Sequence, residues 1–191
     1  MTTIFKRKQW RHISTKGLWK ERIKAALIAA GIAIVLTYWL SPDKEVFIEK
    51  DPYTGAEHRV IDHISEKYHV PPYHAAVIYN AAKENSTDTY PKLEHTLAII
   101  AIESGFNHLA KSKAGAKGLM QVLYKDTEYN IPSNIRDGVQ LLVSYKQSLG
   151  REEAVVQAYN VGIGNYKKGH RNKSYLHSYA LAKKEFKELL S

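Results

Sequence analysis

The sequence predicts an all-α fold, and three observations support this. From residue 56 onward, apolar residues recur at the spacing of one helix face. Prolines and glycines fall where these helices would begin or end. No stretch alternates polar and apolar residues as a half-buried strand does. The part of the chain after residue 55 is long enough to bury its own core, so we expect one helical domain there.

Positive charge is concentrated before this domain. The 191 residues carry a net charge of +9, and residues 1–24 hold eight Lys or Arg against one acid. The remaining residues hold 20 Lys or Arg against 18 acids, so the main domain is nearly balanced. Because nucleic-acid binding needs a basic face, we expect no nucleic-acid partner. The sequence has no cysteine, which excludes disulfides, thiolate chemistry and cysteine-ligated zinc.

Residues 25–41 are uncharged and predict a transmembrane signal anchor. The run is at the short end for a membrane span. Trp19 precedes it, and Tyr38 and Trp39 lie near its other end, as interfacial aromatics do. The basic residues 1–24 would then stay in the cytoplasm. The chain would cross the inner (cytoplasmic) membrane once, with its main domain in the periplasm.

Two other interpretations of this N-terminal segment stay open. A cleavable signal peptide would want small residues before the cut, which Thr37 to Leu40 do not supply. A basic amphipathic arm that binds lipid headgroups or nucleic acid would want a polar face, which the apolar run lacks. We therefore favour an uncleaved anchor.

A linker and two helices follow the anchor. Residues 42–55 are mostly polar, contain two prolines and are typical of a linker to a domain spanning residues 56–191. A first predicted helix is ended by Pro71-Pro72, and a second begins at Tyr73. A polar loop at residues 85–89 follows. The apolar positions of the first helix are Val60, Ile61, Ile64 and Tyr68.

The third predicted helix leads into a carboxylate. Six apolar residues, from Leu97 to Ile102, immediately precede Glu103. Pro91 suits the start of this helix and Gly105 its stop, so we expect a helix buried on most faces with Glu103 in its last turn. Apolar neighbours and the negative pole of the helix would both raise the pKa of this carboxyl. Such a group suits a general acid; the alternative is a solvated glutamate at a helix end.

Caps and glycines divide the rest of the chain. Ser133 suits the N-cap of a long helix, and Gly150 lies just past its end. The predicted elements are a loop at residues 108–118, the long helix from near Ser133, a short helix at residues 151–160, a turn at Gly162 and Gly164, and a closing helix at residues 174–190.

The sequence predicts neither a metal site nor a cofactor. Five histidines lack any recognised metal-ligand spacing, and we interpret them as solvated surface residues. Two glycine-rich turns lack the features of a phosphate-binding loop or a dinucleotide fingerprint. The histidines are His63, His69, His74, His95 and His108.

Four short motifs occur in order between residues 93 and 182. They are Glu103-Ser104-Gly105-Phe106-Asn107, Gly118-Leu119-Met120-Gln121, Ala158-Tyr159-Asn160, and a tyrosine of the closing helix, for which we choose Tyr179. In this order and spacing they resemble the lytic transglycosylases of the soluble-transglycosylase (SLT) type, relatives of goose-type lysozyme. The resemblance implies a lysozyme-like helical domain behind the anchor.

Two departures from the family pattern bear on the site. Val161-Gly162-Ile163-Gly164 stands where Ala-Gly-Pro-Gly is common. The fourth motif is ambiguous, because Tyr175 competes with Tyr179, and the usual Thr three residues before the tyrosine is Leu176 if Tyr179 is chosen.

The resemblance implies cleavage of the β-1,4 bond between N-acetylmuramic acid and N-acetylglucosamine in peptidoglycan. Glu103 would protonate the leaving oxygen and then act as base for the C6 hydroxyl of the same sugar, closing a 1,6-anhydro ring without a cofactor. By the same resemblance, Ser104 positions the substrate or Glu103, Gln121 and Asn160 hold the N-acetyl region, Met120 and Tyr159 line the sugar groove, and Tyr179 orients Glu103.

Two other functions remain open. A hydrolase of the goose-type-lysozyme kind would use water and need a base, for which Asp126, Glu128 and Asp137 are the nearby carboxylates in sequence. A membrane-tethered wall-binding or assembly module would keep the groove with little turnover. Expected partners are peptidoglycan glycan strands, the membrane, and a secretion, conjugation or phage assembly.

Overall fold

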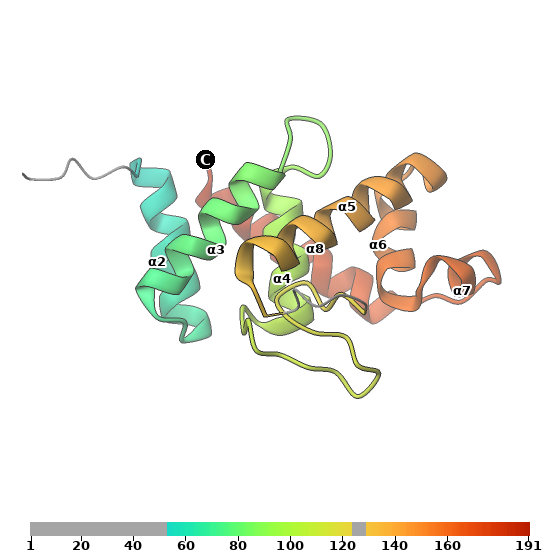
Figure 1. Cartoon of the computed structure of the whole chain (residues 1–191). Coiled ribbons are helices and arrows are strands. Elements are labelled where there is room, and N and C mark those ends of the chain that lie inside the picture. The colour runs from blue at the N-terminus through green and yellow to red at the C-terminus, as the bar shows by residue number, and fades with distance from the viewer. Residues whose placement is uncertain (1–52, 124–128) are drawn as a thin grey trace, which may run out of the picture. The chain divides into compact units, whose positions relative to one another are not determined.

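The computed structural model describes residues 53–123 and 129–191. These residues form seven helices and no strand (Figure 1). The helices are α2 (Gly55–Tyr68), α3 (Pro72–Asn85), α4 (Leu93–Ser104), α5 (Ile131–Leu149), α6 (Glu152–Val161), α7 (Ile163–Lys167) and α8 (Lys173–Leu189). The all-α prediction is thus confirmed for the described part of the chain.

The predicted N-terminal segments lie outside the described residues. They are the basic segment 1–24, the anchor 25–41 and the linker up to residue 52. Within residues 53–123 and 129–191, no helix combines the length and the apolar character that crossing a membrane requires.

Several helix ends follow the predicted signals. Thr54 and Glu57 form a capping box at the start of α2, where each side chain bonds the other's backbone amide. Pro72 begins α3, and α4 ends directly before Gly105, whose backbone is left-handed with φ of 57°. Gly150 likewise follows the last residue of α5.

Three departures from the prediction amount to more than a shift of one residue. The α4 helix begins at Leu93 rather than Pro91, because Lys92 is extended and its backbone amide donates to His95 Nδ1 at 3.1 Å. The N-cap of α5 is Asn130, whose side chain accepts from the Ser133 amide at 3.0 Å. The turn predicted at Gly162 and Gly164 contains the short helix α7.

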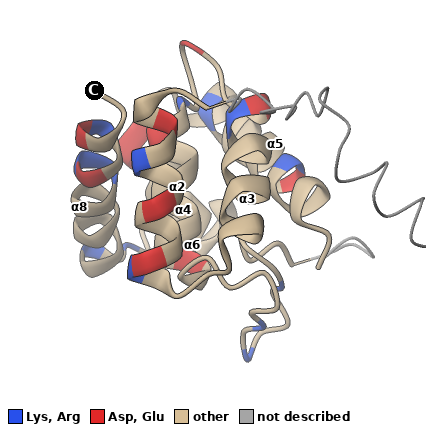
Figure 2. Ribbon diagram, turned by 90° about the vertical axis from the view of Figure 1, so that its left-hand side faces the viewer, with Lys and Arg blue, Asp and Glu red and all other residues tan. Residues whose placement is uncertain are grey.

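The α4 helix forms the centre of the core. In Figures 1 and 2 it runs through the middle of the other helices, and α8 packs along it. Leu97, Ala98, Ile99 and Ile100 are all buried, with at most 1% of their surface exposed. Four consecutive buried residues confirm that α4 is enclosed on most faces. Lys and Arg alternate with Asp and Glu along α2 and α8 (Figure 2). One ion pair between these helices joins Lys67 of α2 to Glu185 of α8.

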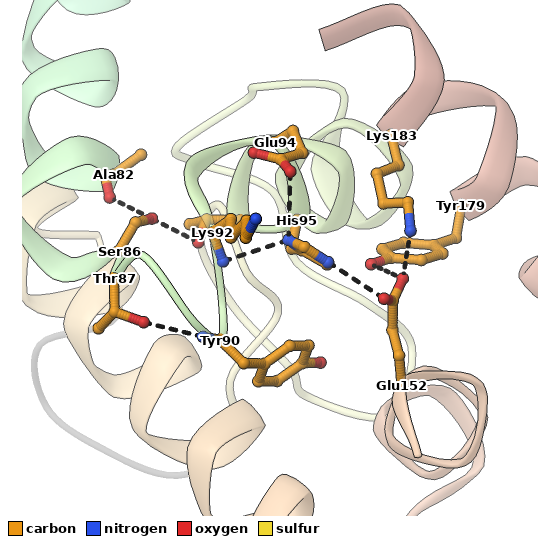
Figure 3. Close-up of polar contacts among 11 residues, drawn as sticks. Ala82, Ser86, Thr87, Tyr90, Lys92, Glu94, His95, Glu152, Tyr179 and Lys183 are labelled. Carbon is orange, nitrogen blue, oxygen red and sulfur yellow. Dashed lines mark hydrogen bonds and ion pairs between the residues drawn. The ribbon is translucent and has the colours of Figure 1, made fainter. Parts of the chain in front are cut away.

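A polar cluster joins α4, α6 and α8 (Figure 3). Glu152, the first residue of α6, accepts hydrogen bonds from Tyr179 at 2.9 Å and Lys183 at 2.6 Å on one oxygen. Its other oxygen accepts from His95 Nε2 at 3.2 Å; Nδ1 of that ring already accepts from Lys92. These donors, His95 first, lower the pKa of Glu152 to about 2. The interpretation of His95 as a solvated residue is therefore wrong: it is 7% exposed and ties α4 to α6.

Candidate active site

Glu103 lies at the C-terminal end of α4, one residue before the helix ends. Its side chain is partly buried, and its Oε1 accepts a hydrogen bond from the Tyr175 hydroxyl of α8 at 2.5 Å. Burial raises the pKa of Glu103, and the Tyr175 hydrogen bond opposes this rise. The predicted direction of the pKa shift is therefore confirmed, with burial as its largest cause.

The structure corrects the predicted role of Tyr179. Its hydroxyl donates to Glu152, whereas Tyr175, one turn earlier on the same face of α8, donates to Glu103. Tyr175 therefore holds the place that the fourth motif assigns. The residue three positions before it is Asn172, the N-cap of α8, where the family pattern has Thr, another capping residue.

Tyr159 joins the third motif to the second. Its hydroxyl donates to the backbone carbonyl of Met120 at 2.8 Å, and the ring lies close enough to Tyr175 to raise the pKa of that phenol. Burial and the neighbouring Glu103 raise the same pKa further, so Tyr175 stays a hydrogen-bond donor across the ordinary pH range.

Met120 is a core residue rather than a lining of the sugar groove. Its side chain is fully buried, which contradicts the predicted groove role. It packs on Gly138 of α5 so closely that a Cβ at that glycine would lie 2.6 Å from Met120 Cβ. Asn134, one turn before Gly138, accepts from the Met120 amide at 2.8 Å and donates to the Lys117 carbonyl at 3.0 Å. The α5 helix thus fixes the second motif.

The sequence reasoning missed Asn134 and Gly138. A signal was present, since a glycine and an asparagine four residues apart interrupt the apolar face of a long helix. Asn134 is 1% exposed, and a buried amide of this kind needs specific partners.

Gln121 and Ser104 are held by their own surroundings. Gln121 has a left-handed backbone with φ of 48°, and its Nε2 donates to the carbonyls of Ala110 at 3.2 Å and Gly118 at 2.8 Å. Because the nitrogen is committed to the loop, the amide oxygen is the atom left to accept from a ligand. The Ser104 hydroxyl donates to the Ile100 carbonyl of its own helix at 3.1 Å rather than to Glu103.

Asn160 belongs to a chain of amides that leads to Tyr175. Its Oδ1 accepts from Asn172 Nδ2 at 2.9 Å. Asn172 Oδ1 in turn accepts from the Tyr175 backbone amide at 3.0 Å, which caps α8. Gln157, directly before the third motif, hydrogen bonds both backbone groups of Asn172. The sequence reasoning missed Gln157 and Asn172. A signal for Asn172 was present, because this asparagine, a good N-cap residue, directly precedes the closing helix and lies three residues before Tyr175.

A cavity of about 400 Å³ opens directly after α4. It lies between the junction of α2 with α3, which contributes residues 68–71 and His74, and residues 105–108. Rings of Tyr68, His74 and His108 contribute to its wall, and none of its lining residues is Lys, Arg, Asp or Glu. A wall with ring faces and without Lys, Arg, Asp or Glu suits an uncharged ligand with apolar faces.

The comparison with known families agrees with this arrangement. A family model described as transglycosylase SLT domain matches residues 78–181, from α3 into α8. The matched range is more than half of the chain and contains Glu103, Gln121, Tyr159 and Tyr175. A search of curated proteins gave no match. The chain therefore belongs to the transglycosylase SLT domain family, whose general function is transglycosylase action on peptidoglycan.

Proposed function

We propose that the chain is a lytic transglycosylase that cleaves the β-1,4 bond between N-acetylmuramic acid and N-acetylglucosamine and leaves a 1,6-anhydro ring. One observation carries the proposal: Glu103 is a partly buried carboxyl with a raised pKa, hydrogen-bonded by Tyr175 on a single oxygen. A carboxyl of this kind can hold a proton at neutral pH and release it to a substrate.

The first step uses the proton of Glu103. Because the Tyr175 hydroxyl donates to Oε1, the proton is expected on Oε2, which then faces the glycosidic oxygen. Transfer of this proton breaks the bond between C1 of N-acetylmuramic acid and that oxygen, and the 2-acetamido group stabilises the positive charge at C1. Tyr175 keeps its hydrogen bond and stabilises the new carboxylate.

The second step returns the proton. The C6 hydroxyl of the same sugar attacks C1, and the Glu103 carboxylate takes the hydroxyl proton. One C–O bond has broken and one has formed, no water is consumed, and the acid is regenerated. Glycosidases usually need two carboxylates. Here the second group comes from the substrate, and intramolecular attack lowers its own barrier by proximity.

The surroundings of Glu103 favour this one-carboxylate scheme over hydrolysis. Among the described residues, burial and the Tyr175 hydrogen bond are the influences on its pKa, and no second carboxylate is one of them. Of the three carboxylates considered as a base for a hydrolase, Asp126 and Glu128 lie outside the described residues. Asp137 lies on α5 beside Arg136.

The side-chain amides of Gln121 and Asn160 suit a sugar with an N-acetyl group. In this proposal the Gln121 carbonyl oxygen accepts from the acetamido N–H, and Asn160 also holds the N-acetyl region. The cavity after α4 takes a neighbouring sugar of the strand against its ring faces. Ser104 acts by fixing the end of α4 rather than by contacting Glu103.

The anchor at residues 25–41 completes the proposal. It would hold the enzyme at the inner membrane with the domain in the periplasm, where a secretion, conjugation or phage assembly must open the wall. The full chain should fractionate with the membranes. Protease added to intact spheroplasts should degrade its domain. Protection from protease, or release into the soluble fraction, would contradict this topology.

The catalytic assignment is tested with Glu103→Gln in the full chain. The variant keeps the side-chain shape and should bind purified sacculi, but their cleavage should fall at least about a hundredfold because the proton donor is gone. Glu66→Gln, which neutralises an exposed glutamate of α2, is the control and should cleave normally. Substantial cleavage by Glu103→Gln would overturn the assignment.

A further inference from the structure

We propose that Gln157 and Asn172 are positioning residues that place the Tyr175 hydroxyl against Glu103. The inference rests on the proposed function, in which Glu103 is the acid, and it adds two residues that act through a third. Its basis is a continuous set of hydrogen bonds from the middle of α6 to the first turn of α8.

Gln157 fixes the backbone of Asn172. The Asn172 amide donates to Gln157 Oε1 at 2.7 Å, and the Asn172 carbonyl accepts from Gln157 Nε2 at 3.1 Å. Both ends of one side-chain amide are thus used on one residue. Gln157 is 3% exposed, so its loss would leave two polar backbone groups without these partners where water has little access. This pair holds the residue directly before α8 in one place.

Asn172 in turn fixes the backbone of Tyr175. Its Oδ1 accepts from the Tyr175 backbone amide at 3.0 Å, and its Nδ2 donates to Asn160 Oδ1 at 2.9 Å. All four polar groups of Asn172 are therefore engaged. Because the capped amide belongs to Tyr175 itself, the cap sets where that residue's backbone lies and hence where its hydroxyl meets Glu103.

Another asparagine cap in the chain offers a comparison. Asn130 caps α5 with the same bond, accepting from the Ser133 amide at 3.0 Å. It is exposed, and no glutamine clamps its backbone as Gln157 clamps Asn172 among the described contacts. A helix start can therefore be capped without such a clamp. Capping alone does not account for the hydrogen bonds from Gln157 to Asn172, and we assign them the positioning role.

The charge state of Glu103 reports whether Tyr175 is in place. The groups that act on Tyr175 are Glu103 from α4, Tyr159 from α6 and Tyr179 from α8. The Tyr175 hydrogen bond lowers the pKa of Glu103 against the effect of burial. A displaced Tyr175 would thus let this pKa rise. Because the acid must be protonated, activity falls as pH rises through this pKa, and the fall would move to higher pH.

The experiment measures kcat and KM against pH for the full chain on soluble glycan oligomers. Asn172→Ala and Gln157→Leu should lower kcat about tenfold and leave KM within about twofold. They should also move the alkaline fall of activity to higher pH, as we expect for Tyr175→Phe. The double variant Asn172→Ala with Tyr175→Phe should shift the alkaline fall of activity no further than Tyr175→Phe alone does. Asn172→Thr, which keeps a cap, should restore most of the activity.

Asn130→Ala is the matched control. It removes an equivalent cap and should lower stability, but the alkaline fall of activity should stay where the wild type has it. If Asn172→Ala or Gln157→Leu does not fold, the isosteric Gln157→Glu replaces it. The glutamate carboxylate can still accept from the Asn172 amide but has no N–H to donate to the Asn172 carbonyl. Folded variants with an unmoved alkaline fall would overturn the proposal.

Failure of the proposed function would look different. In that case the wild type itself would form no anhydro products. The pKa of Glu103, followed through its carboxyl carbon by NMR in the full chain without substrate, would still rise in Asn172→Ala if the positioning role is right. An unchanged pKa in that measurement would reject the positioning role independently of activity.

Discussion

Glu103 and Glu152 each accept a hydrogen bond from a tyrosine of α8, yet their pKa values move in opposite directions. Glu103 accepts from the Tyr175 hydroxyl, and burial outweighs this hydrogen bond and raises the pKa of Glu103. Glu152 has Tyr179, His95 and Lys183, and these donors lower its pKa to about 2. The number and charge of the donors, rather than the tyrosine, decide which carboxyl can serve as an acid.

The two tyrosines should therefore differ in what their loss affects. Tyr175→Phe removes the donor on Glu103 and should lower kcat roughly tenfold to a hundredfold, since a hydrogen bond to a charged group is worth about 1.5–3 kcal/mol. Tyr179→Phe should keep activity within about threefold and lower the free energy of unfolding by about 1–2 kcal/mol. Kinetics and urea unfolding of both variants check this. A larger loss of kcat in Tyr179→Phe would restore Tyr179 as the partner of Glu103.

Glu103 should also cost stability at neutral pH. Its pKa is raised in the folded chain, so the folded state holds more protons than the unfolded state in the window above the ordinary value of 4.5. Stability then falls as pH rises through that window. Glu103→Gln should raise the free energy of unfolding near pH 7 by about 0.5–2 kcal/mol, with the gain disappearing below about pH 4. A variant less stable than wild type near pH 7 would contradict the raised pKa.

Among the helices, α5 affects the site indirectly, through the loop that it holds in place. It contributes no group to Glu103, but Asn134 and Gly138 hold the loop that carries Met120 and Gln121. Asn134 satisfies the backbone of this loop, and Gly138 allows the side chain of Met120 to pack against the helix backbone. Gln121 can present its amide oxygen only if this loop keeps its place.

Gly138→Ala should disturb both stability and the loop. Its Cβ would lie 2.5 Å from Met120 Sδ and 2.6 Å from Met120 Cβ, so the backbone of the loop must move. We expect a loss of about 1–3 kcal/mol in unfolding free energy and a higher KM. Gly164→Ala is the control, because a Cβ there meets nothing within 4 Å. Thermal unfolding and steady-state kinetics decide, and a Gly138→Ala variant as stable as Gly164→Ala would reject the close contact.

The helices and the acid Glu103 could be predicted from the sequence, but the side-chain contacts between the helices could not. Proline signals placed the break between α2 and α3, and glycine signals placed the C-terminal ends of α4 and α5, since these residues act through local backbone geometry. Tyr175 and Tyr179 share one face of α8, so spacing alone could not decide which meets Glu103. That choice depends on how α8 packs on α4 and α6, which is a tertiary property.

Met120 and His95 were misplaced for a related reason. A methionine beside a glycine-rich turn and a histidine near a helix start both resemble exposed residues in sequence. Both are buried, Met120 by the absence of a side chain at Gly138 and His95 by its bond to Glu152. Such burial depends on partners far along the chain.

At the scale of the whole domain, α8 is fastened to the rest of the core at two levels. Tyr175 joins its first turn to the end of α4. Figure 3 shows the second level, where Tyr179 and Lys183 join the middle of α8 to Glu152 at the start of α6. His95 links the same Glu152 to the start of α4. The polar cluster therefore keeps the three helices in register and the Tyr175 hydroxyl near Glu103.

Loss of the Glu152 charge should lower the stability of the whole domain. Its folded pKa of about 2 lies below the ordinary 4.5, so its stabilising effect is present above about pH 4.5 and is lost as pH falls toward 2. Glu152→Gln should lower the free energy of unfolding by about 1–2 kcal/mol near pH 7, and the gap should narrow by about pH 3. Glu153→Gln, its exposed neighbour, should change little. Equal effects of the two variants in urea unfolding would contradict the role of the cluster.

The central claim is that Glu103 transfers its proton and the substrate, not water, attacks C1. Digestion of purified sacculi by the full chain in water enriched in oxygen-18, followed by mass spectrometry, tests it most directly. We predict muropeptides lighter by one water than lysozyme products, without heavy oxygen at C1, and no such products from Glu103→Gln. Products with a free reducing end that carries one heavy oxygen would make the enzyme a hydrolase and contradict the account.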